Sequence, residues 1–315
     1  MYKLAIVVPC YNEEAILKNT CETLVNLLDD LTLTGKITEQ SYILFVNDGS
    51  SDDSWNILCR EHDLSNRINA INLAANVGHQ NALLAGLDYV QDDVDIAISI
   101  DADLQDDICV IEQMIDKYSK GADIVYGVRN NRKSDSFLKR NSANLFYKFM
   151  TAMGVKTIYN HADFRLMSRR VIKQLMLYKE RNLYLRGIIP SLGYKTDCVY
   201  YTRLKRGGGK SKYSLSKMLR LASDGITSFT TRPITLITVL GFIIILFALA
   251  AFVYTLISYF TGNTAPGWSS LMISIWFLGG VQLFSIGIVG KYVGKAYFET
   301  KQRPRYDIVE ELKHE

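Results

Sequence analysis

Hydrophobic and polar positions follow two alternating patterns along the first 126 residues. Residues Leu4–Val8 form a short, wholly apolar run, which is typical of a strand buried on both faces of a parallel sheet. The next segment, Glu14–Asp30, has apolar residues at helical spacing and predicts a helix. The same alternation predicts strands at Tyr42–Val46, Ile68–Asn72, Ile96–Ile100 and Ile124–Tyr126, and helices at Asp53–His62, Gln80–Val90 and Ile108–Lys120. This order indicates an α/β domain whose mostly parallel sheet is covered on both faces.

The pattern changes after residue 232. From Pro233 to Gly290 the chain has no Asp, Glu, Lys or Arg over 58 residues. A polar, turn-rich link at Thr261–Gly267 divides this stretch into two apolar segments, Ile234–Phe260 and Leu271–Val293. As helices they would be roughly 40 Å and 35 Å long, and a hydrocarbon core is about 30 Å thick. We therefore predict two membrane-spanning helices rather than a pair of buried helices in a large soluble core.

The charges that flank the two apolar segments predict their orientation. Arg232 precedes the first segment, and the link between the segments has no Lys or Arg. Basic residues at or beyond the end of the second segment are Lys291, Lys295, Lys301, Arg303 and Arg305. Because positive charge favours the cytoplasmic side, we expect both termini in the cytoplasm. Small residues on the second segment, among them Gly279, Gly280 and Gly287, would allow close helix packing within the chain or between copies of a homo-oligomer.

Average composition conceals this division. The 315 residues are 48% hydrophobic and 22% charged, with a net charge of +4 and a mean hydropathy of +0.04. Taken alone, these values describe a soluble globular protein and exclude a disordered chain, a collagen-like repeat and a disulfide scaffold. The five cysteines form no Cys-x-x-Cys pair and no Cys/His cluster, which indicates reduced thiols in the cytosol rather than a zinc site.

Four groups of polar residues each follow one of the predicted strands. They lie at Pro9–Glu14, Asn47–Asp52, Asn76–Gln80 and Asp101–Gln105. Ligands of parallel sheets bind beyond the carboxyl ends of the strands. We therefore expect the four groups to meet at one edge of the sheet and to form the ligand site.

The strongest chemical signal among them is Asp101-Ala102-Asp103. Two carboxylates directly after a buried strand are costly to leave unpaired, and a divalent cation is a suitable partner. A second copy, Asp93-Val94-Asp95, precedes the same strand and is expected to be a solvated turn at the opposite end of the sheet. Asp48 is expected to be free to accept hydrogen bonds from a base or ribose. His79 and His161 lack a Ser or Cys partner that would indicate a hydrolase triad.

A basic loop, Arg206–Lys212, precedes the first apolar segment. It does not match a P-loop, because Leu204 stands where the first glycine would be required. Such a loop could close over phosphates or contact anionic lipid headgroups. Stretches Phe137–Met153 and Tyr213–Phe229 combine basic with apolar and aromatic residues, and either lie in the headgroup layer or pack on the sheet.

Seven motifs occur in a fixed order along the chain. They are Val8-Pro9-Cys10-Tyr11-Asn12-Glu13-Glu14, Asn47-Asp48-Gly49-Ser50-Ser51-Asp52, Asn76-Val77-Gly78-His79-Gln80, Asp101-Ala102-Asp103-Leu104-Gln105-Asp106, Gly127-Val128-Arg129, Ala162-Asp163-Phe164-Arg165-Leu166-Met167-Ser168-Arg169 and Gly209-Lys210-Ser211-Lys212-Tyr213. Together they resemble inverting family 2 glycosyltransferases of the GT-A fold. More narrowly, the chain resembles the polyisoprenyl-phosphate glycosyltransferases, the dolichol-phosphate mannose synthase and bactoprenol glucosyltransferase group. With its two predicted C-terminal membrane helices, the chain resembles the bacterial, bactoprenol branch of this group. This resemblance implies that the protein is located in the bacterial plasma membrane.

The resemblance implies transfer of a sugar from a nucleotide sugar to a membrane polyprenyl phosphate, with Mg²⁺ or Mn²⁺ as cofactor. The implied nucleotide-binding residues are Pro9, Tyr11, Asn12, Glu13, Asp48, Asn76, Asp101 and Ala102. Asp103 and Gln105 are the implied metal ligands. The implied catalytic residues are Asp103, Arg129 and Asp163, of which Asp163 would orient the acceptor or act as a weak base. Candidates for binding phosphate or the lipid headgroup are Arg129, Arg140, Arg206, Lys210, Ser211 and Lys212.

These inferences define a plan of the chain and its partners. A catalytic domain at 1–210 would be followed by an amphipathic juxtamembrane segment at 211–232, the two spans within 233–294, and a cytoplasmic tail at 295–315. The expected partners are undecaprenyl phosphate, the bilayer and a nucleotide sugar, not a nucleic acid. UDP-glucose is the favoured donor, and UDP-GlcNAc or another nucleotide sugar is the alternative. The product would be a lipid-linked sugar for cell-envelope glycosylation.

Two other classes of protein fit the sequence less well. A processive polysaccharide synthase is disfavoured because no Gln-x-x-Arg-Trp motif occurs and two helices are few for a translocation channel. A non-enzymatic sugar-nucleotide sensor is disfavoured because Asp101, Asp103 and Gln105 are all intact.

Overall fold

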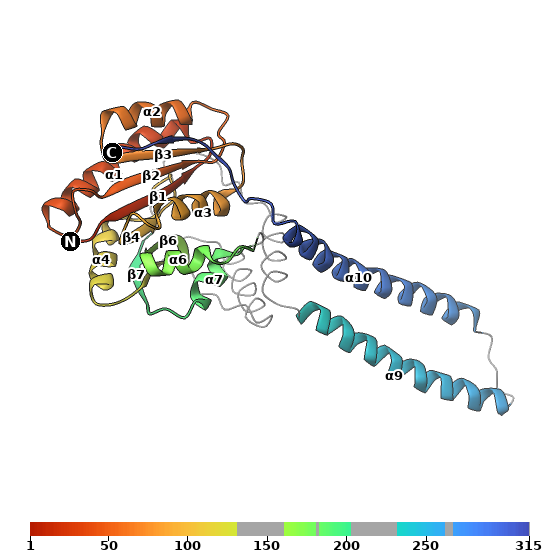
Figure 1. Ribbon diagram of the computed structural model, residues 1–315. Helices are drawn as coiled ribbons and strands as arrows, with labels where there is room; N and C mark the ends of the chain where they lie inside the picture. The colour runs from red at the N-terminus through yellow and green to blue at the C-terminus, as the bar shows by residue number, and fades with distance from the viewer. Residues whose placement is uncertain (131–160, 181–182, 203–231, 262–266, 315) are drawn as a thin grey trace. The chain divides into compact units, whose positions relative to one another are not determined.

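The computed structural model describes residues 1–130, 161–180, 183–202, 232–261 and 267–314, and these residues belong to two compact units (Figure 1). The first unit contains the described residues up to 202 together with 303–314. The second contains the described residues from 232 to 302. The chain therefore leaves the first unit and later returns to it.

An eight-stranded mixed sheet forms the centre of the first unit, with strand order β7-β5-β6-β4-β1-β2-β3-β8. The strands are β1 (Leu4–Cys10), β2 (Tyr42–Asn47), β3 (Ile68–Leu73), β4 (Ile96–Ser99), β5 (Ile124–Arg129), β6 (His161–Ser168), β7 (Thr196–Tyr201) and β8 (Ile308–Leu312). Neighbours are parallel except where β6 pairs with β4 and β5, and where β8 pairs with β3. The prediction of an α/β domain with a mostly parallel sheet is confirmed.

Helices cover both faces of this sheet. They are α1 (Glu14–Leu33), α2 (Ser54–Leu64), α3 (His79–Val90), the short 3₁₀ helix η1 (Ile108–Val110), α4 (Ile111–Ser119), α6 (Arg169–Met176) and α7 (Leu185–Ser191). Apolar residues of α1, α2 and α4 share one core cluster with alternate residues of β1 and β2. Helix α3 packs on the opposite face of the same two strands. Every residue of β1 is buried, as its uninterrupted apolar run predicts.

The contact of α3 with the sheet requires glycine at position 86. A Cβ atom at Gly86 would lie 2.5 Å from Cγ1 of Val7 and 2.8 Å from Cγ2 of Val46. In an open helix, alanine is more stable than glycine by about 1 kcal/mol. Here the added methyl group has to displace two β-branched side chains, so we expect Gly86→Ala to lower the free energy of unfolding by about 1–3 kcal/mol. Thermal unfolding in detergent measures the change, and a variant more stable than wild type would contradict this packing.

The second Asp-x-Asp copy is bonded to its surroundings more than the sequence predicts. Oδ1 of Asp93 accepts a hydrogen bond from Nζ of Lys3 at 2.6 Å, and Oδ2 accepts one from the Tyr42 hydroxyl at 2.9 Å. Asp95 accepts the backbone N–H of Lys3 at 2.9 Å. The turn does precede β4, but the expectation that it is merely solvated is wrong, because these carboxylates fasten the start of β1.

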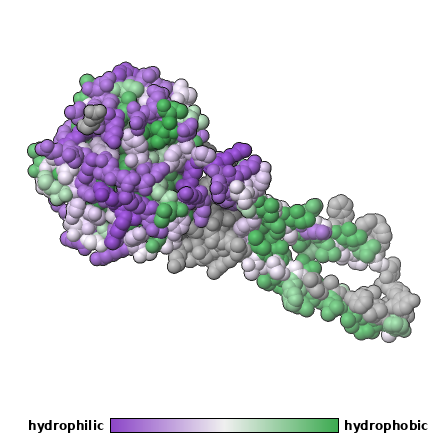
Figure 2. Space-filling view, in the orientation of Figure 1, coloured by the Kyte–Doolittle hydropathy of each residue, from purple (hydrophilic) through white to green (hydrophobic). Residues whose placement is uncertain are grey.

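Helices α9 (Arg232–Phe260) and α10 (Trp268–Thr300) make up the described part of the second unit. Their stretches Pro233–Ala251 and Phe277–Thr300 are, by length and composition, long and apolar enough to cross a membrane. Figure 2 shows hydrophobic residues along the visible side of both helices. Large apolar side chains of the two helices, such as Phe247 and Phe284, are exposed. The predicted segments fall within the two helices, and their orientation stays a prediction.

Residues beyond α10 contribute a strand that the sequence analysis did not foresee. β8 lies within the segment expected only as a tail, and it adds to the edge of the sheet beside β3 (Figure 1). The sequence of β8, Ile-Val-Glu-Glu-Leu, lacks a clear alternation of apolar and polar residues. Its pairing with β3 is fixed by contacts with residues more than 200 positions away in the sequence.

Candidate active site

The four predicted polar groups lie at the same edge of the sheet. Registers set this edge: Cys10 is paired with Asn47, and Asn47 with Asn72, so β1, β2 and β3 end side by side. On the other side of β1, Val7 is paired with Ser99 near the end of β4. The loops that follow these strands therefore begin next to one another, as the rule for parallel sheets predicts.

Asp48 connects two of these loops. Its Oδ1 accepts the backbone N–H of Val77 at 2.7 Å, and its Oδ2 accepts that of Gly78 at 3.0 Å. Burial raises the pKa of Asp48, although these two hydrogen bonds act in the opposite direction. Each oxygen thus accepts one backbone hydrogen bond and keeps one further lone pair, so the expectation that Asp48 accepts hydrogen bonds from a base or ribose stays a prediction.

The turn after β2 also requires glycine at position 49. Gly49 has a φ of 61°, and a Cβ there would lie 2.6 Å from the carbonyl carbon of Ala75. The turn thus packs directly against the backbone of the loop that contains Asn76. Asn12, in the loop after β1, connects that loop to the same turn, because its Oδ1 accepts the N–H of Ser51 at 2.8 Å.

The segment that follows β4 brings several carboxylates together. Oδ1 of Asp101 lies 3.5 Å from Nε2 of His79, and Oδ1 of Asp103 accepts the N–H of Gln105 at 3.3 Å. Burial, together with the nearby carboxylates of Asp163, Asp106 and Asp103, raises the pKa of Asp101, and His79 partly offsets the rise. Asp101 therefore has three other carboxylates as neighbours.

Ala102 and Gln105 of the same segment are buried. Ala102 belongs to the core cluster, and its carbonyl accepts a hydrogen bond from Oγ1 of Thr20 at 2.8 Å. Among the described residues, no group of three or more His, Cys, Asp or Glu side chains is arranged to enclose a metal ion. Mg²⁺ commonly uses only one or two carboxylates and takes its other ligands from water and substrate phosphates, so Asp101, Asp103 and Gln105 still suit such a cation.

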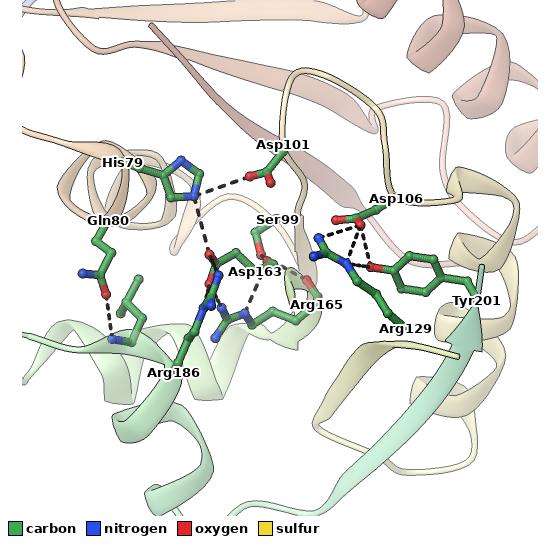
Figure 3. A network of polar contacts seen from close by, with 11 residues as sticks. His79, Gln80, Ser99, Asp101, Asp106, Arg129, Asp163, Arg165, Arg186 and Tyr201 are labelled. Carbon is green, nitrogen blue, oxygen red and sulfur yellow. Dashed lines mark hydrogen bonds and ion pairs between the residues drawn. The ribbon is translucent and has the colours of Figure 1, made fainter. Parts of the chain in front are cut away.

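Asp163 lies at the centre of a charged network with two arginines (Figure 3). Its Oδ1 lies 2.5 Å from Nη2 of Arg165, and its Oδ2 lies 2.7 Å from Nη2 of Arg186. Nε2 of His79 is 3.8 Å from Oδ2, which places this histidine between Asp163 and Asp101. Gln80 accepts the N–H of Leu185 at 3.0 Å and so holds α7, the helix that carries Arg186, next to α3.

This network determines the charge of Asp163. Burial alone raises the pKa of the carboxyl, but the guanidiniums of Arg186 and Arg165 outweigh it and hold the pKa well below the usual range. A carboxylate with so low a pKa has little tendency to take up a proton. The role of Asp163 in orienting the acceptor stays a prediction, and its two arginine partners are compatible with that role.

Arg129, the last residue of β5, is held by a second network next to the first (Figure 3). Its Nε and Nη2 lie 3.1 Å and 2.9 Å from Oδ1 of Asp106, a buried carboxylate. The hydroxyl of Tyr201 donates to the same oxygen at 2.7 Å. Burial alone lowers the pKa of Arg129, but Asp106 outweighs this effect and raises it, so the guanidinium is a fixed, permanently charged group.

The structure thus brings together residues from the four loops with Arg129 and Asp163, and it adds residues that the sequence analysis did not select. Those additions are Asp106, Arg165, Arg186 and Tyr201. Asp106 and Arg165 stood inside quoted motifs, whereas nothing near Arg186 or Tyr201 in the sequence indicated a role. Arg140, Arg206, Lys210, Ser211 and Lys212 lie outside the described residues, as do the amphipathic stretches 137–153 and 213–229.

The sequence is similar to a known protein family and to several named proteins. Residues 5–176 match the sequence model of the family glycosyl transferase family 2. Glycosyltransferase YkoT of Bacillus subtilis (strain 168) is 49% identical over 99% of this chain and 93% of its own length. The prophage bactoprenol glucosyl transferase homolog of Escherichia coli (strain K12) is 39% identical over 97% of this chain and 98% of its own length.

A solved structure of low sequence identity is also similar. It is glucosyl-3-phosphoglycerate synthase of Mycobacterium tuberculosis in complex with Mn²⁺, UDP and glucosyl-3-phosphoglycerate, with a TM-score of 0.46 and 13% identity over 72% of this chain and 78% of that one. The family match covers more than half of the chain, and relatives at 39–49% identity cover nearly all of it. The resemblance drawn from the motifs is confirmed: the chain belongs to glycosyl transferase family 2.

Proposed function

We propose that this glycosyltransferase moves glucose from UDP-glucose to undecaprenyl phosphate with inversion at the anomeric carbon. The observation that carries the proposal is the 39% identity to bactoprenol glucosyl transferases, such as that of Shigella phage SfX, over 96% of this chain and 98% of the relative. Two apolar helices after the catalytic domain support a membrane acceptor. A lipid-linked sugar of this kind would serve as a donor for glycosylation of the cell envelope.

The carboxylate segment after β4 is the proposed place for a divalent cation. Asp103 and Gln105 would hold Mg²⁺ or Mn²⁺, with Asp101 close to the ion and the ribose. Oxygen donors are the ligands that both ions prefer, and a cation would offset the charges of Asp101 and Asp103. When bound, the cation stabilises the charge that grows on the departing nucleoside diphosphate.

The remaining roles are proposed for side chains that surround this segment. Asp48, Asn76, Tyr11 and Glu13 would bind the nucleotide at the ends of β1, β2 and β3. Arg129, fixed by Asp106 and Tyr201, would bind a phosphate group.

The acceptor needs little help from a base. A phosphate monoester has a second pKa of about 6, so its oxygen is already anionic near neutral pH and can attack the anomeric carbon directly. The bond from that carbon to the diphosphate breaks on the opposite face, which inverts the configuration. Asp163 would contribute by holding Arg186 beside the acceptor rather than by removing a proton.

The membrane arrangement follows from the same proposal. Helices α9 and α10 would span the bacterial plasma membrane, with the catalytic domain and both termini in the cytoplasm. The basic loop at 206–212 and the segment at 211–232 would then lie near lipid headgroups. This arrangement would keep the catalytic domain close to an acceptor whose phosphate lies at the membrane surface.

A direct assay tests this function. Purified full-length protein is incubated with undecaprenyl phosphate, Mg²⁺ or Mn²⁺, and a panel of labelled nucleotide sugars that includes UDP-glucose and UDP-GlcNAc. We expect label to enter the lipid fraction from UDP-glucose, and we expect EDTA to abolish the transfer and added metal to restore it. Transfer from UDP-GlcNAc alone would reassign the donor, whereas a water-soluble polymer without any lipid-linked product would overturn the proposal.

A further inference from the structure

We propose that the segment after the second apolar helix is a positioning element of the nucleotide site, and that it acts through Glu310. This segment, Arg303–His314, is called the C-terminal strap below and includes β8. The inference rests on the proposed function, in which the nucleotide binds at the ends of β1, β2 and β3. It concerns how those ends are held, not which residues touch the substrate.

The strap holds the start of a loop at the ligand edge. β8 runs antiparallel to β3, with Asn72 paired to Glu310 and Leu73 to Ile308. Beyond the last strand pair, the N–H of Ala74 donates to the carbonyl of Asp307 at 3.0 Å. The strap is therefore bonded to the backbone up to the point where the loop 74–78 begins, and this is the loop whose amides bind Asp48.

A chain of side-chain hydrogen bonds leads from Glu310 to the end of β2. Oε1 of Glu310 accepts from Nδ2 of Asn72 at 3.0 Å, and Oε2 accepts from Nε1 of Trp55 at 3.2 Å. Oδ1 of Asn72 in turn accepts from Nδ2 of Asn47 at 2.8 Å. Asn47 is buried and directly precedes Asp48. The carboxylate of the strap is thus two hydrogen bonds away from the residue that begins the Asp48 turn.

The charge of Glu310 gives this chain a fixed direction. A carboxylate only accepts hydrogen bonds, so Asn72 has to point its NH₂ group towards Glu310 and its oxygen towards Asn47. That choice also fixes the amide of Asn47, whose own oxygen is buried without a partner among the described residues. A residue that could donate as well as accept at position 310 would leave both amides free to reverse. Glu310 therefore selects one arrangement beneath the Asp48 turn.

The next residue of the strap provides a natural control, because Glu311 points to the opposite face of the sheet. Its Oε2 accepts from the Tyr89 hydroxyl at 3.0 Å, and the Tyr306 hydroxyl donates to Asp88 at 2.6 Å. Tyr89 and Asp88 lie near the last residue of α3, whereas the ligand edge lies at its first residue, His79. Glu311 therefore attaches the strap as Glu310 does, but its hydrogen bond leads away from the nucleotide loops.

Loops that are held in their binding conformation bind a ligand more tightly, because less order has to be gained on binding. The strap begins three residues after α10 ends, so the second apolar helix is joined through it to the loop 74–78. Removal of the Glu310 carboxylate should therefore weaken nucleotide binding and leave the catalytic step itself unchanged.

The test compares full-length wild type with Glu310→Ala, Glu310→Gln and Glu311→Ala in detergent. Calorimetry gives the Kd of UDP with Mg²⁺, and the lipid-transfer assay gives kcat and the donor KM. For Glu310→Ala we expect Kd and KM to rise about 3- to 30-fold with kcat within about twofold of wild type. Glu310→Gln should show a smaller rise, and it keeps the test valid if the alanine variant folds poorly. Glu311→Ala should change neither Kd nor KM.

Thermal midpoints separate a positioning role from a structural one. If Glu310→Ala and Glu311→Ala lower the midpoint equally and neither changes the Kd of UDP, the strap only stabilises the fold and the inference fails. If wild type binds none of UDP, GDP, ADP and CDP, the proposed function fails and the inference with it. Wild-type binding that is unaltered in both Glu310 variants overturns the inference alone.

Discussion

Asp103→Asn should reduce lipid-linked product formation by about 100- to 1,000-fold and leave the thermal midpoint nearly unchanged. The proposed role of Asp103 is to hold the cation that stabilises the leaving diphosphate, and removal of one such electrostatic contribution usually has an effect of this size. Asp103 is only half-buried and lies in a loop, so the amide should fit in its place. Initial rates at saturating UDP-glucose and metal measure the loss in kcat.

The second Asp-x-Asp copy supplies the control for this prediction. Asp93→Asn removes the same charge from the same short motif at the opposite end of β4, where Asp93 bonds Lys3 and Tyr42. We expect it to lower the free energy of unfolding by about 1 kcal/mol and to leave kcat unchanged. A variant at Asp103 that keeps full activity, or one at Asp93 that loses it, would show that position relative to the strand does not separate the two motifs.

Strands at the centre of the sheet could be predicted from the sequence because their local pattern carries the signal. β1 is buried on both faces, so its residues are apolar without interruption from Leu4 to Val8. Strands β6, β7 and β8 could not be predicted in the same way. β6 carries Asp163 and Arg165, and β7 begins with exposed polar residues, so only their long-range pairing identifies them as strands.

The residues of the candidate site likewise fall into those that a local sequence pattern indicates and those that only long-range contacts identify. Asp48, Asp101 and Asp103 were found because they directly follow strands whose ends have to converge. Arg186 and Tyr201 were missed because each acquires its role only when another carboxylate, Asp163 or Asp106, is brought to it by folding. The hydrogen bonds of Asp48 could not be predicted either. The backbone N–H groups that donate to it are positioned by the conformation of the loop 74–78, and no pattern of residues in the sequence indicates that conformation.

Asp163→Asn should lower the free energy of unfolding by about 3–5 kcal/mol, because it would leave a buried arginine without its counterion. Arg165 is fully buried, and within the described residues both hydrogen bonds of its side chain go to Asp163. Arg186 is about a third exposed, at 34%, so water can compensate part of its loss. Arg186→Gln should accordingly be less destabilising than Asp163→Asn.

The dependence on pH has a definite sign. The folded pKa of Asp163 is depressed, so its contribution to stability is present above the unfolded value of about 3.9 and is lost only as pH falls through the folded value. The carboxylate of Asp163 should therefore contribute equally at pH 6 and at pH 8. His79 lies 3.8 Å from its Oδ2, so both proteins of the comparison carry His79→Gln and the charge of this histidine does not enter. If Asp163→Asn is less destabilising in this background at pH 6 than at pH 8, Asp163 takes up a proton in this range, as a base would.

A double substitution distinguishes loss of a counterion from loss of packing. Asp163→Asn combined with Arg165→Met removes both members of the buried pair and keeps a side chain of similar length at position 165. We expect the double variant to be more stable than Asp163→Asn alone by about 1–3 kcal/mol, as measured by chemical unfolding, because no uncompensated charge remains buried. If the two losses were simply additive, the uncompensated charge of Arg165 within β6 would not be the cause of the instability of Asp163→Asn.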